Sequence, residues 1–250
     1  MSRQDETLRR FVVRYGLDAE GRPLAPDMDT ATLFEKCRAI VCDQGADYER
    51  HGKIIQTELP YSLERLENLV RFELAHTDAS SLPKLPDGLE TLVCRYNMLT
   101  TLGEELPPSL THVYCVGNRI VQWPKMPDAL AYLNIFNTLS LSCESVEIGL
   151  AEPERLPNSL RVLILGNLPL AKLPKMPENL KTLQLFHCGL AHLPKLPESV
   201  KEIDIYENGL TSVSNDESFF EAPFRRLSSP SIRKLFSRKE SDEERIRKPA

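Results

Sequence analysis

The side chains best able to do covalent or metal chemistry in this sequence are its cysteines, and their spacing favours neither. They form no C-x-x-C pair and no Cys/His set at the spacing of a zinc site. Cys94 and Cys115 fall at equivalent inward positions of neighbouring repeats, where a thiol packs as a small hydrophobe and parallel side chains give poor disulfide geometry. We expect exposure only at Cys42 and Cys143. The six are Cys37, Cys42, Cys94, Cys115, Cys143 and Cys188.

The histidines and glycines offer no catalytic or cofactor motif. No H-E-x-x-H and no histidine pair at i, i+4 occurs, and neither a G-x-x-x-x-G-K-[ST] loop nor a G-x-G-x-x-G turn is present. We place His76, His112 and His187 on or near the exposed face of predicted strands. We therefore expect no catalytic residue, no metal, no cofactor and no enzymatic activity.

An internal repeat determines which elements position these side chains. Its frames begin at positions 69, 89, 110, 130, 160, 180 and 200, so five of the six steps are 20 or 21 residues and the other is 30. Two frames depart from the pattern: Leu168 occupies a position where a polar residue is expected, and the frame from Leu130 loses register after Ile135. A complete frame has apolar residues at Leu89, Leu92, Cys94, Leu99 and Leu102, with Asn97 at its eighth step.

Each part of a frame has a structural meaning. The alternating L-x-L core predicts a short strand with one buried face. The eighth position holds Asn, Thr or Cys in six of seven frames, where a short polar side chain can bond the backbone of neighbouring turns. The connecting LPxLPxxL segments cannot be helical, because proline fixes φ and lacks an amide hydrogen. The pattern predicts a leucine-rich-repeat solenoid with short parallel β-strands on its concave face and an extended, polyproline-like convex side.

The segment LPKLPDGLETLVCRYNMLTTL resembles the 20-residue repeat of bacterial leucine-rich-repeat effectors delivered by type III secretion, a family that includes YopM-like scaffolds. The resemblance covers about residues 59–213. It implies a curved parallel sheet whose concave face binds host proteins. One branch of the family adds a C-terminal, cysteine-dependent ubiquitin ligase. Here no cysteine follows Cys188 and only residues 214–250 follow the last frame, so we do not expect that ligase.

The segments outside the repeats lead to three further predictions. Residues 1–58 are predicted to hold a strand at 11–16 and, after a cap at Asp29 or Thr30, a helix with an apolar stripe that caps the solenoid. Residues 139–159 form an insertion, either tolerated or functional. Residues 214–250 form a basic tail that is either solvated or a docking element. Ser228 follows two arginines and a leucine, a possible phosphorylation site. The helix stripe is Leu33, Phe34, Cys37, Ile40 and Val41.

Composition narrows the class of partner. The net charge of −5 disfavours nucleic acid. No stretch approaches the roughly 20 apolar residues of a membrane span, and the N-terminal residues do not form a secretory signal peptide. The cysteines fit a protein in a reducing cellular compartment better than a disulfide-bonded framework. A protein partner is the remaining expectation, and the oligomeric state stays open.

The second, fourth and sixth steps of each frame should point outward. Large aromatic residues at several of them predict a contiguous exposed patch, which marks a binding surface unless the insertion or the tail folds over it. The predicted protein-binding residues are Arg95, Tyr114, Tyr132, Phe136, Ile164, Phe186 and Tyr206.

We therefore predict a non-catalytic protein-binding module, a secreted effector that acts on a host protein in the host cytoplasm. Two alternatives remain open. The chain could be the substrate-recognition part of a ubiquitin-ligase-type effector that works with a separate catalytic chain. It could also be an adaptor or structural protein that stays in the cytoplasm of its own cell.

Overall fold

The computed structural model describes residues 2–45, 58–138, 155–168, 170, 172–215, 219 and 226–227. It divides into two compact units, Met1–Thr138 and Leu139–Ala250. The boundary falls in the predicted repeat domain of residues 59–213, where the insertion begins. Cys143, Ser228, most of the 139–159 insertion and nearly all of the basic tail lie outside the described residues.

The first unit begins with helix α1 (Arg3–Tyr15), which has a capping box between Ser2 and Asp5. The predicted strand at 11–16 is therefore wrong for all but its last residue. Leu8, Phe11 and Val12 form one buried stripe of α1, so helical burial overrides the local β-preference of the FVV triplet. Strand β1 (Gly16–Leu17) follows directly and pairs antiparallel with β2 (Ala39–Asp43).

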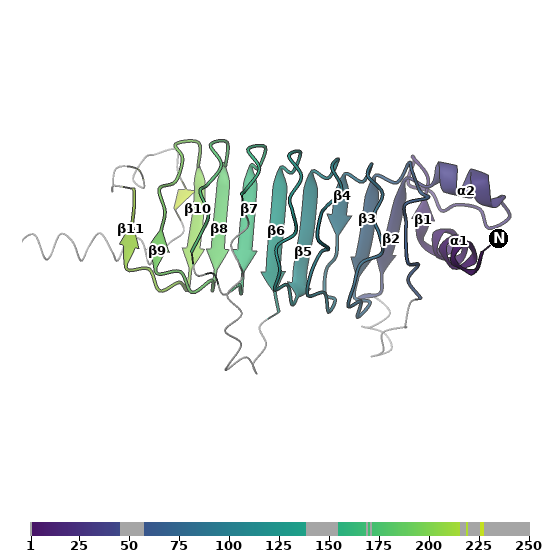
Figure 1. The fold of residues 1–250 in the computed structure, drawn as a ribbon, viewed down its shortest axis with the longest axis horizontal. Helices are drawn as coiled ribbons and strands as arrows, with labels where there is room; N and C mark the ends of the chain where they lie inside the picture. The colour runs from purple at the N-terminus through teal and green to yellow at the C-terminus, as the bar shows by residue number, and fades with distance from the viewer. Residues whose placement is uncertain are drawn as a thin grey trace, which may run out of the picture. The chain divides into compact units, whose positions relative to one another are not determined.

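Helix α2 (Thr30–Lys36) starts where predicted, because the Asp29 carboxylate accepts a hydrogen bond from the Thr32 amide. Its predicted extension to Val41 is wrong. The chain leaves the helix at Cys37 and enters β2, where Ile40 and Cys42 alternate inward. Cys42 is consequently buried, against the prediction of an exposed thiol. In Figure 1 both helices lie at the β1 end of this unit.

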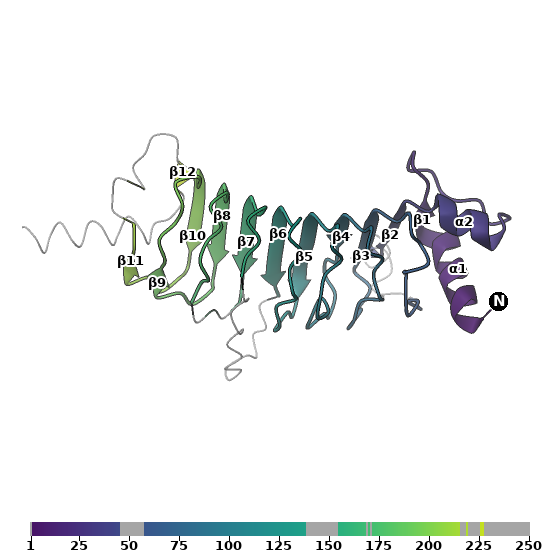
Figure 2. The same ribbon diagram turned by 45° about the horizontal axis from the view of Figure 1, so that its top comes forward.

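Parallel strands form the rest of the first unit. The sheet order is β1-β2-β3-β4-β5-β6, and every pair from β2 onward is parallel (Figures 1 and 2). Strand β2 adds one parallel strand before the first predicted frame. The frame strands are β3 (Arg71–Ala75), β4 (Thr91–Val93), β5 (His112–Asn118) and β6 (Tyr132–Asn137).

The second unit repeats this arrangement. Its main strands run β7-β8-β10-β12 in parallel, and β9 and β11 make a separate parallel pair. Third-step residues of successive frames are register partners, such as Leu163 with Leu183 and Leu183 with Ile203, as the repeat predicts. The strands are β7 (Val162–Gly166), β8 (Thr182–Phe186), β9 (His192–Leu193), β10 (Glu202–Tyr206), β11 (Ser212–Val213) and β12 (Arg226–Leu227).

The side chains of eighth-step asparagines form hydrogen bonds to the turn before them. Together these asparagines form what we call the asparagine ladder. The Asn97 amide donates to the Leu74 carbonyl at 2.8 Å and accepts from the Thr77 amide at 3.0 Å. Asn118 donates to Cys94 at 2.6 Å and accepts from Leu99 at 3.1 Å. In the second unit Asn208 bonds the carbonyl of Leu185 and the amides of Cys188 and Leu190. At the same step Cys188 directs its thiol to the Leu165 carbonyl at 3.6 Å. This confirms the predicted role of the eighth step.

The two irregular frames have local explanations. Residue Gly117 is an extra residue in β5, a bulge that shifts the register so that Asn118 pairs with Asn137. Asn137 then bonds both backbone groups of Ile120, one step earlier than Thr138 would. At the other irregular frame Leu168 is fully buried, so an apolar contact replaces the polar link.

The LPxLP segments return in extended form, as predicted. Neighbouring return segments are linked by isolated parallel bridges, Ser62 with Lys84 and Glu105 with Lys125. Both units are thus stacked turns of a leucine-rich-repeat solenoid: leucines inside, short parallel strands on one side and proline-rich segments on the other.

Replacing Asn118 by alanine should lower the free energy of unfolding by about 2–4 kcal/mol, because the Cys94 carbonyl and the Leu99 amide would lose their partner in the interior. Chemical denaturation checks this. The matched control is Asn179→Ala, an exposed asparagine that bonds the Asn158 carbonyl and should cost well under about 1 kcal/mol. Equal losses at the two positions would contradict the proposed importance of the asparagine ladder.

Candidate protein-binding face

The outer strand face comprises the side chains at the second, fourth and sixth steps of the strands, opposite the leucine core. Along β6 and β8, and along β5 as far as the bulge at Gly117, it alternates with the core, half-buried outside and buried inside. The predicted outward positions are therefore on this face. Each unit carries its own part of it.

In the first unit, three rings stack across β5 and β6. Tyr114 and Tyr132 have centroids 4.5 Å apart, and His112 lies 6.4 Å from the first and 5.9 Å from the second. His112 is the register partner of Tyr132, and Phe136 is the partner of Val116. Between Tyr132 and Phe136, the side-chain oxygen of Asn134 is buried without a hydrogen-bond partner among the described residues. These residues make a continuous aromatic and apolar surface.

Beside this stack, β3 and β4 carry a charged network. Glu73 is 6% exposed, and its two carboxylate oxygens accept from Arg71 at 2.6 Å and from Arg95 at 2.8 Å. Arg95 also lies 3.8 Å from Asp43. Arg95, which the sequence predicted as a protein-binding residue, is thus held in an ion network, and a partner could reach its exposed part.

A second aromatic group lies where the strands of the first unit end. His76 bonds Asp43 at 2.9 Å and stacks on Tyr96 at 4.6 Å between centroids. Burial raises the pKa of the Asp43 carboxyl, but the Gly45 amide, His76 and Arg95 together bring the pKa below its usual value. Asp43 is therefore ionised at neutral pH, so its hydrogen bond to His76 is charge-assisted.

In the second unit the outer strand face is apolar at one margin and acidic beside it. Phe186 is the register partner of both Gly166 and Tyr206, and Ile164 is the partner of Gln184. Glu202 and Asp204 lie two residues apart on β10, both on the outer strand face. Burial together with the charge of Glu202 raises the pKa of Asp204. The hydrogen bond and charge of Glu207 raise the pKa of the exposed Tyr206.

The structure brings Tyr114 and Tyr132 into ring contact and sets Phe186 beside Tyr206. Ile164 and the predicted aromatic residues are half-buried, except for Tyr206, which is 47% exposed. Sequence reasoning missed Tyr96, which is 51% exposed. Tyr96 stands at the seventh step, just after the strand positions that were used to assign outward side chains. Its position in the frame was the only signal in the sequence that could have pointed to it.

The buried thiols are poor nucleophiles. Burial raises the pKa of Cys37 to about 12 and that of Cys188 to about 11. A hydrogen bond to Cys115, together with burial, raises the pKa of Cys94 well above the ordinary thiol value. Thiolate, the reactive form, is scarce at such sites. No disulfide joins the cysteines that the structure describes.

The described part of the chain shows neither a metal-binding cluster nor a membrane-spanning helix. It holds no group of three His, Cys, Asp or Glu side chains arranged around a metal position. Among its helices, none has the length and apolar content needed to cross a membrane.

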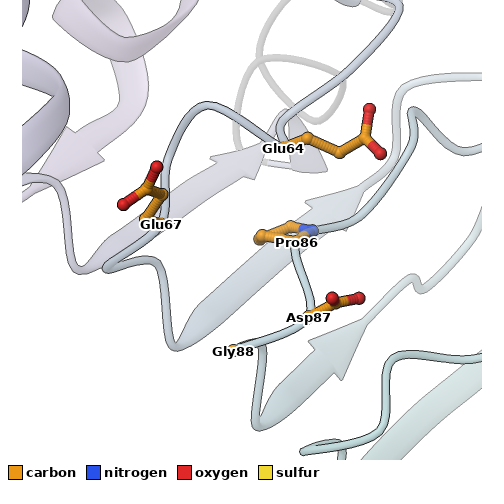
Figure 3. A pocket seen from close by; sticks show the side chains of 5 residues that line it. All are labelled: Glu64, Glu67, Pro86, Asp87 and Gly88. Atoms are coloured by element: carbon orange, nitrogen blue, oxygen red, sulfur yellow. The ribbon is translucent and has the colours of Figure 1, made fainter.

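A shallow hollow of about 250 Å³ lies on the return-segment side of the first unit (Figure 3). Its carboxylates do not converge on a common point in Figure 3, so they form no evident ligand site. The lining residues are Glu64, Glu67, Pro86, Asp87 and Gly88.

Replacing Glu73 by alanine should lower the free energy of unfolding by about 1–3 kcal/mol, since it removes the shared acceptor of two arginines from a buried position. Glu105→Ala is the control, because Glu105 and Lys125 form a pair that is largely exposed and worth less than about 1 kcal/mol. Urea titrations of both variants measure the difference. A loss at Glu73 no larger than at Glu105 would show that the network adds no stability.

Asp204→Asn should raise the melting temperature at neutral pH. A carboxyl with a raised pKa binds protons more readily in the folded chain, so its charge lowers stability above that pKa. The penalty disappears as the pH falls through the raised pKa of Asp204, and the advantage of the variant should shrink with it. Melting curves at several pH values test this. An advantage that is absent at neutral pH, or unchanged in acid, would contradict it.

This chain is similar to solved structures but matches no protein-family model. No curated protein matches it either. Among solved structures it is similar to YopM from Yersinia enterocolitica WA-314, with 25% sequence identity and a TM-score of 0.48. The match covers 68% of this chain and 38% of that one, so the chain spans well under half the length of that protein.

Proposed function

We propose that this chain is a non-catalytic protein-binding module that contacts its partner through the outer strand face. The observation that carries the proposal is the ring stack of His112, Tyr114 and Tyr132 on β5 and β6. Aromatic side chains dominate the energetics of protein interfaces, and rings already packed against one another lose little conformational entropy on binding.

Polar groups beside the stack support the same function. The unpartnered oxygen of Asn134 can accept a hydrogen bond from a partner, which would offset its burial. Arg95 contributes a guanidinium that is fixed by Glu73 yet still 41% exposed. An aromatic centre with fixed polar groups at its margin is the composition of a protein interface.

We further propose that the partner is a host protein and that the chain acts in the host cytoplasm as a secreted effector. This proposal rests on the LPxLPxxL repeat and its resemblance to type III effector repeats. A reporter fused to the full chain would test it, since export through a type III apparatus into cultured host cells should be detected. Absence of transfer would favour an adaptor in the cytoplasm of its own cell.

Partner binding should separate from stability in matched variants. Leu185→Ala removes a fully buried side chain and should cost about 2–5 kcal/mol. Phe136→Ala, Phe186→Ala and the double variant Tyr114→Ala with Tyr132→Ala should stay folded while losing partner capture, because their side chains lie on the outer strand face. Thermal melts and cross-linked affinity capture with mass spectrometry measure both properties. Folded outer-face variants that still capture every wild-type partner would refute this interface.

Catalysis has its own test. Replacing the six cysteines should leave partner capture intact, apart from lower stability at the buried positions Cys37, Cys42, Cys94, Cys115 and Cys188. A ubiquitin-charging assay on the wild-type chain should give no thioester. A thioester on any cysteine would overturn the proposal of a non-catalytic module.

A further inference from the structure

In six of the seven frames, all but the one from Leu130, the residue at the seventh step has left-handed backbone geometry. Glycine adopts this conformation at little cost, whereas bulky residues are strained in it. The neighbouring turns impose it: the His76 amide donates to Arg95 at 3.0 Å, and the Tyr96 amide donates to Val116 at 2.7 Å. The positive φ values are 53° at His76, 52° at Tyr96, 74° at Gly117, 54° at Asn167, 51° at His187 and 50° at Glu207.

Gly117 shows that the turn accepts glycine, so the bulky residues need another explanation. Local backbone rules are most often broken where a surface has a task besides folding. Tyr96 is the largest of these residues and 51% exposed. It is therefore the position at which the conflict between backbone preference and side chain is greatest.

The Tyr96 ring is fixed between its neighbours. His76 stacks on it with rings 18° from parallel, and His76 is in turn held by Asp43. Gly117 leaves the space that the ring uses, since a Cβ there would lie 2.5 Å from Cδ1 of Tyr96. The Tyr96 hydroxyl bonds no other residue in the described part of the chain. The result is a rigid phenol with its polar end free.

We propose that Tyr96, braced by His76 and Gly117, is an anchor for an uncharged segment of a protein partner. That the ligand is a protein rests on the proposed function. The site itself is inferred from the left-handed backbone at Tyr96 and from the contacts of its ring with His76 and Gly117. A fixed aromatic side chain binds without the entropic loss of ordering, which is the property of interface anchors. The hydroxyl can donate to a backbone carbonyl of the bound segment.

The charges nearby favour an uncharged ligand. Arg71 and Arg95 are balanced by Glu73 and Asp43 in contacts of 2.6–3.8 Å. This leaves no net charge from these four residues to attract phosphate groups, acidic segments or basic segments. An apolar side chain packed on the ring edge, with hydrogen bonds from the adjacent peptide, fits such a surface.

The test uses the full chain and a random dodecapeptide library displayed on phage, with depletion on the Tyr96→Asn variant. Asparagine tolerates left-handed geometry, so this variant removes the ring without adding strain. Enriched peptides should be uncharged and should bind the wild-type chain at least about tenfold more tightly than Tyr96→Asn. The control is Tyr61→Asn, which removes another tyrosine that is 67% exposed and should leave the affinity unchanged.

Melting curves complete the test. Tyr96→Asn should melt at the wild-type temperature or above it, because the strain is relieved. A sharp fall in melting temperature would show that Tyr96 serves folding, and would overturn the proposal. Three other results would also overturn it: no enrichment of peptides, equal affinity of the peptides for the wild-type chain and for Tyr96→Asn, or enrichment of strongly charged peptides. Peptide binding that depends on Tyr96 but survives the Tyr114 and Tyr132 double variant would uphold this anchor even if the stacked-ring interface failed.

Discussion

The solenoid depends on one constraint: the backbone amide and carbonyl groups at the end of each strand must find hydrogen-bond partners. After the strand, the chain turns away and leaves carbonyl and amide groups in the interior that strand pairing does not reach. Asn97, Asn118 and Asn208 supply both a donor and an acceptor to the turn before, which few other short side chains can do. Because an unsatisfied interior group is costly, these hydrogen bonds help to hold neighbouring turns together.

The same turn explains the character of the candidate site. Alternation along the strands places leucines inside and leaves His112, Tyr114 and Tyr132 outside, within reach of one another. At Asn97, Asn118 and Asn208 the residue just before the ladder asparagine, at the seventh step, has left-handed geometry. Tyr96 stands at such a step, so the interaction that stabilises the stack also presents a strained aromatic residue to solvent.

Charge is arranged differently in the two units. On β3 and β4, Glu73 gathers Arg71 and Arg95 into a compact neutral network, and the buried carboxylate is acceptable because both of its oxygens are bonded. On β10, burial together with the negative charge of Glu202 raises the pKa of Asp204. The two parts of the outer strand face therefore offer different chemistry to a partner, the first neutral and aromatic, the second aromatic and acidic.

The sequence by itself determined the repeat, the inward leucines and the polar eighth step, since each depends on a period that is visible in the chain. Tertiary structure decided the rest. Burial of Phe11 and Val12 made a helix from a segment with β-preference, and pairing with β3 turned the predicted end of a helix into β2, which buried Cys42. The bulge at Gly117 made Asn137 rather than Thr138 the ladder residue. The exposure of Tyr96 and the network around Glu73 depend on contacts between turns about 20 residues apart, and no local pattern encodes such contacts.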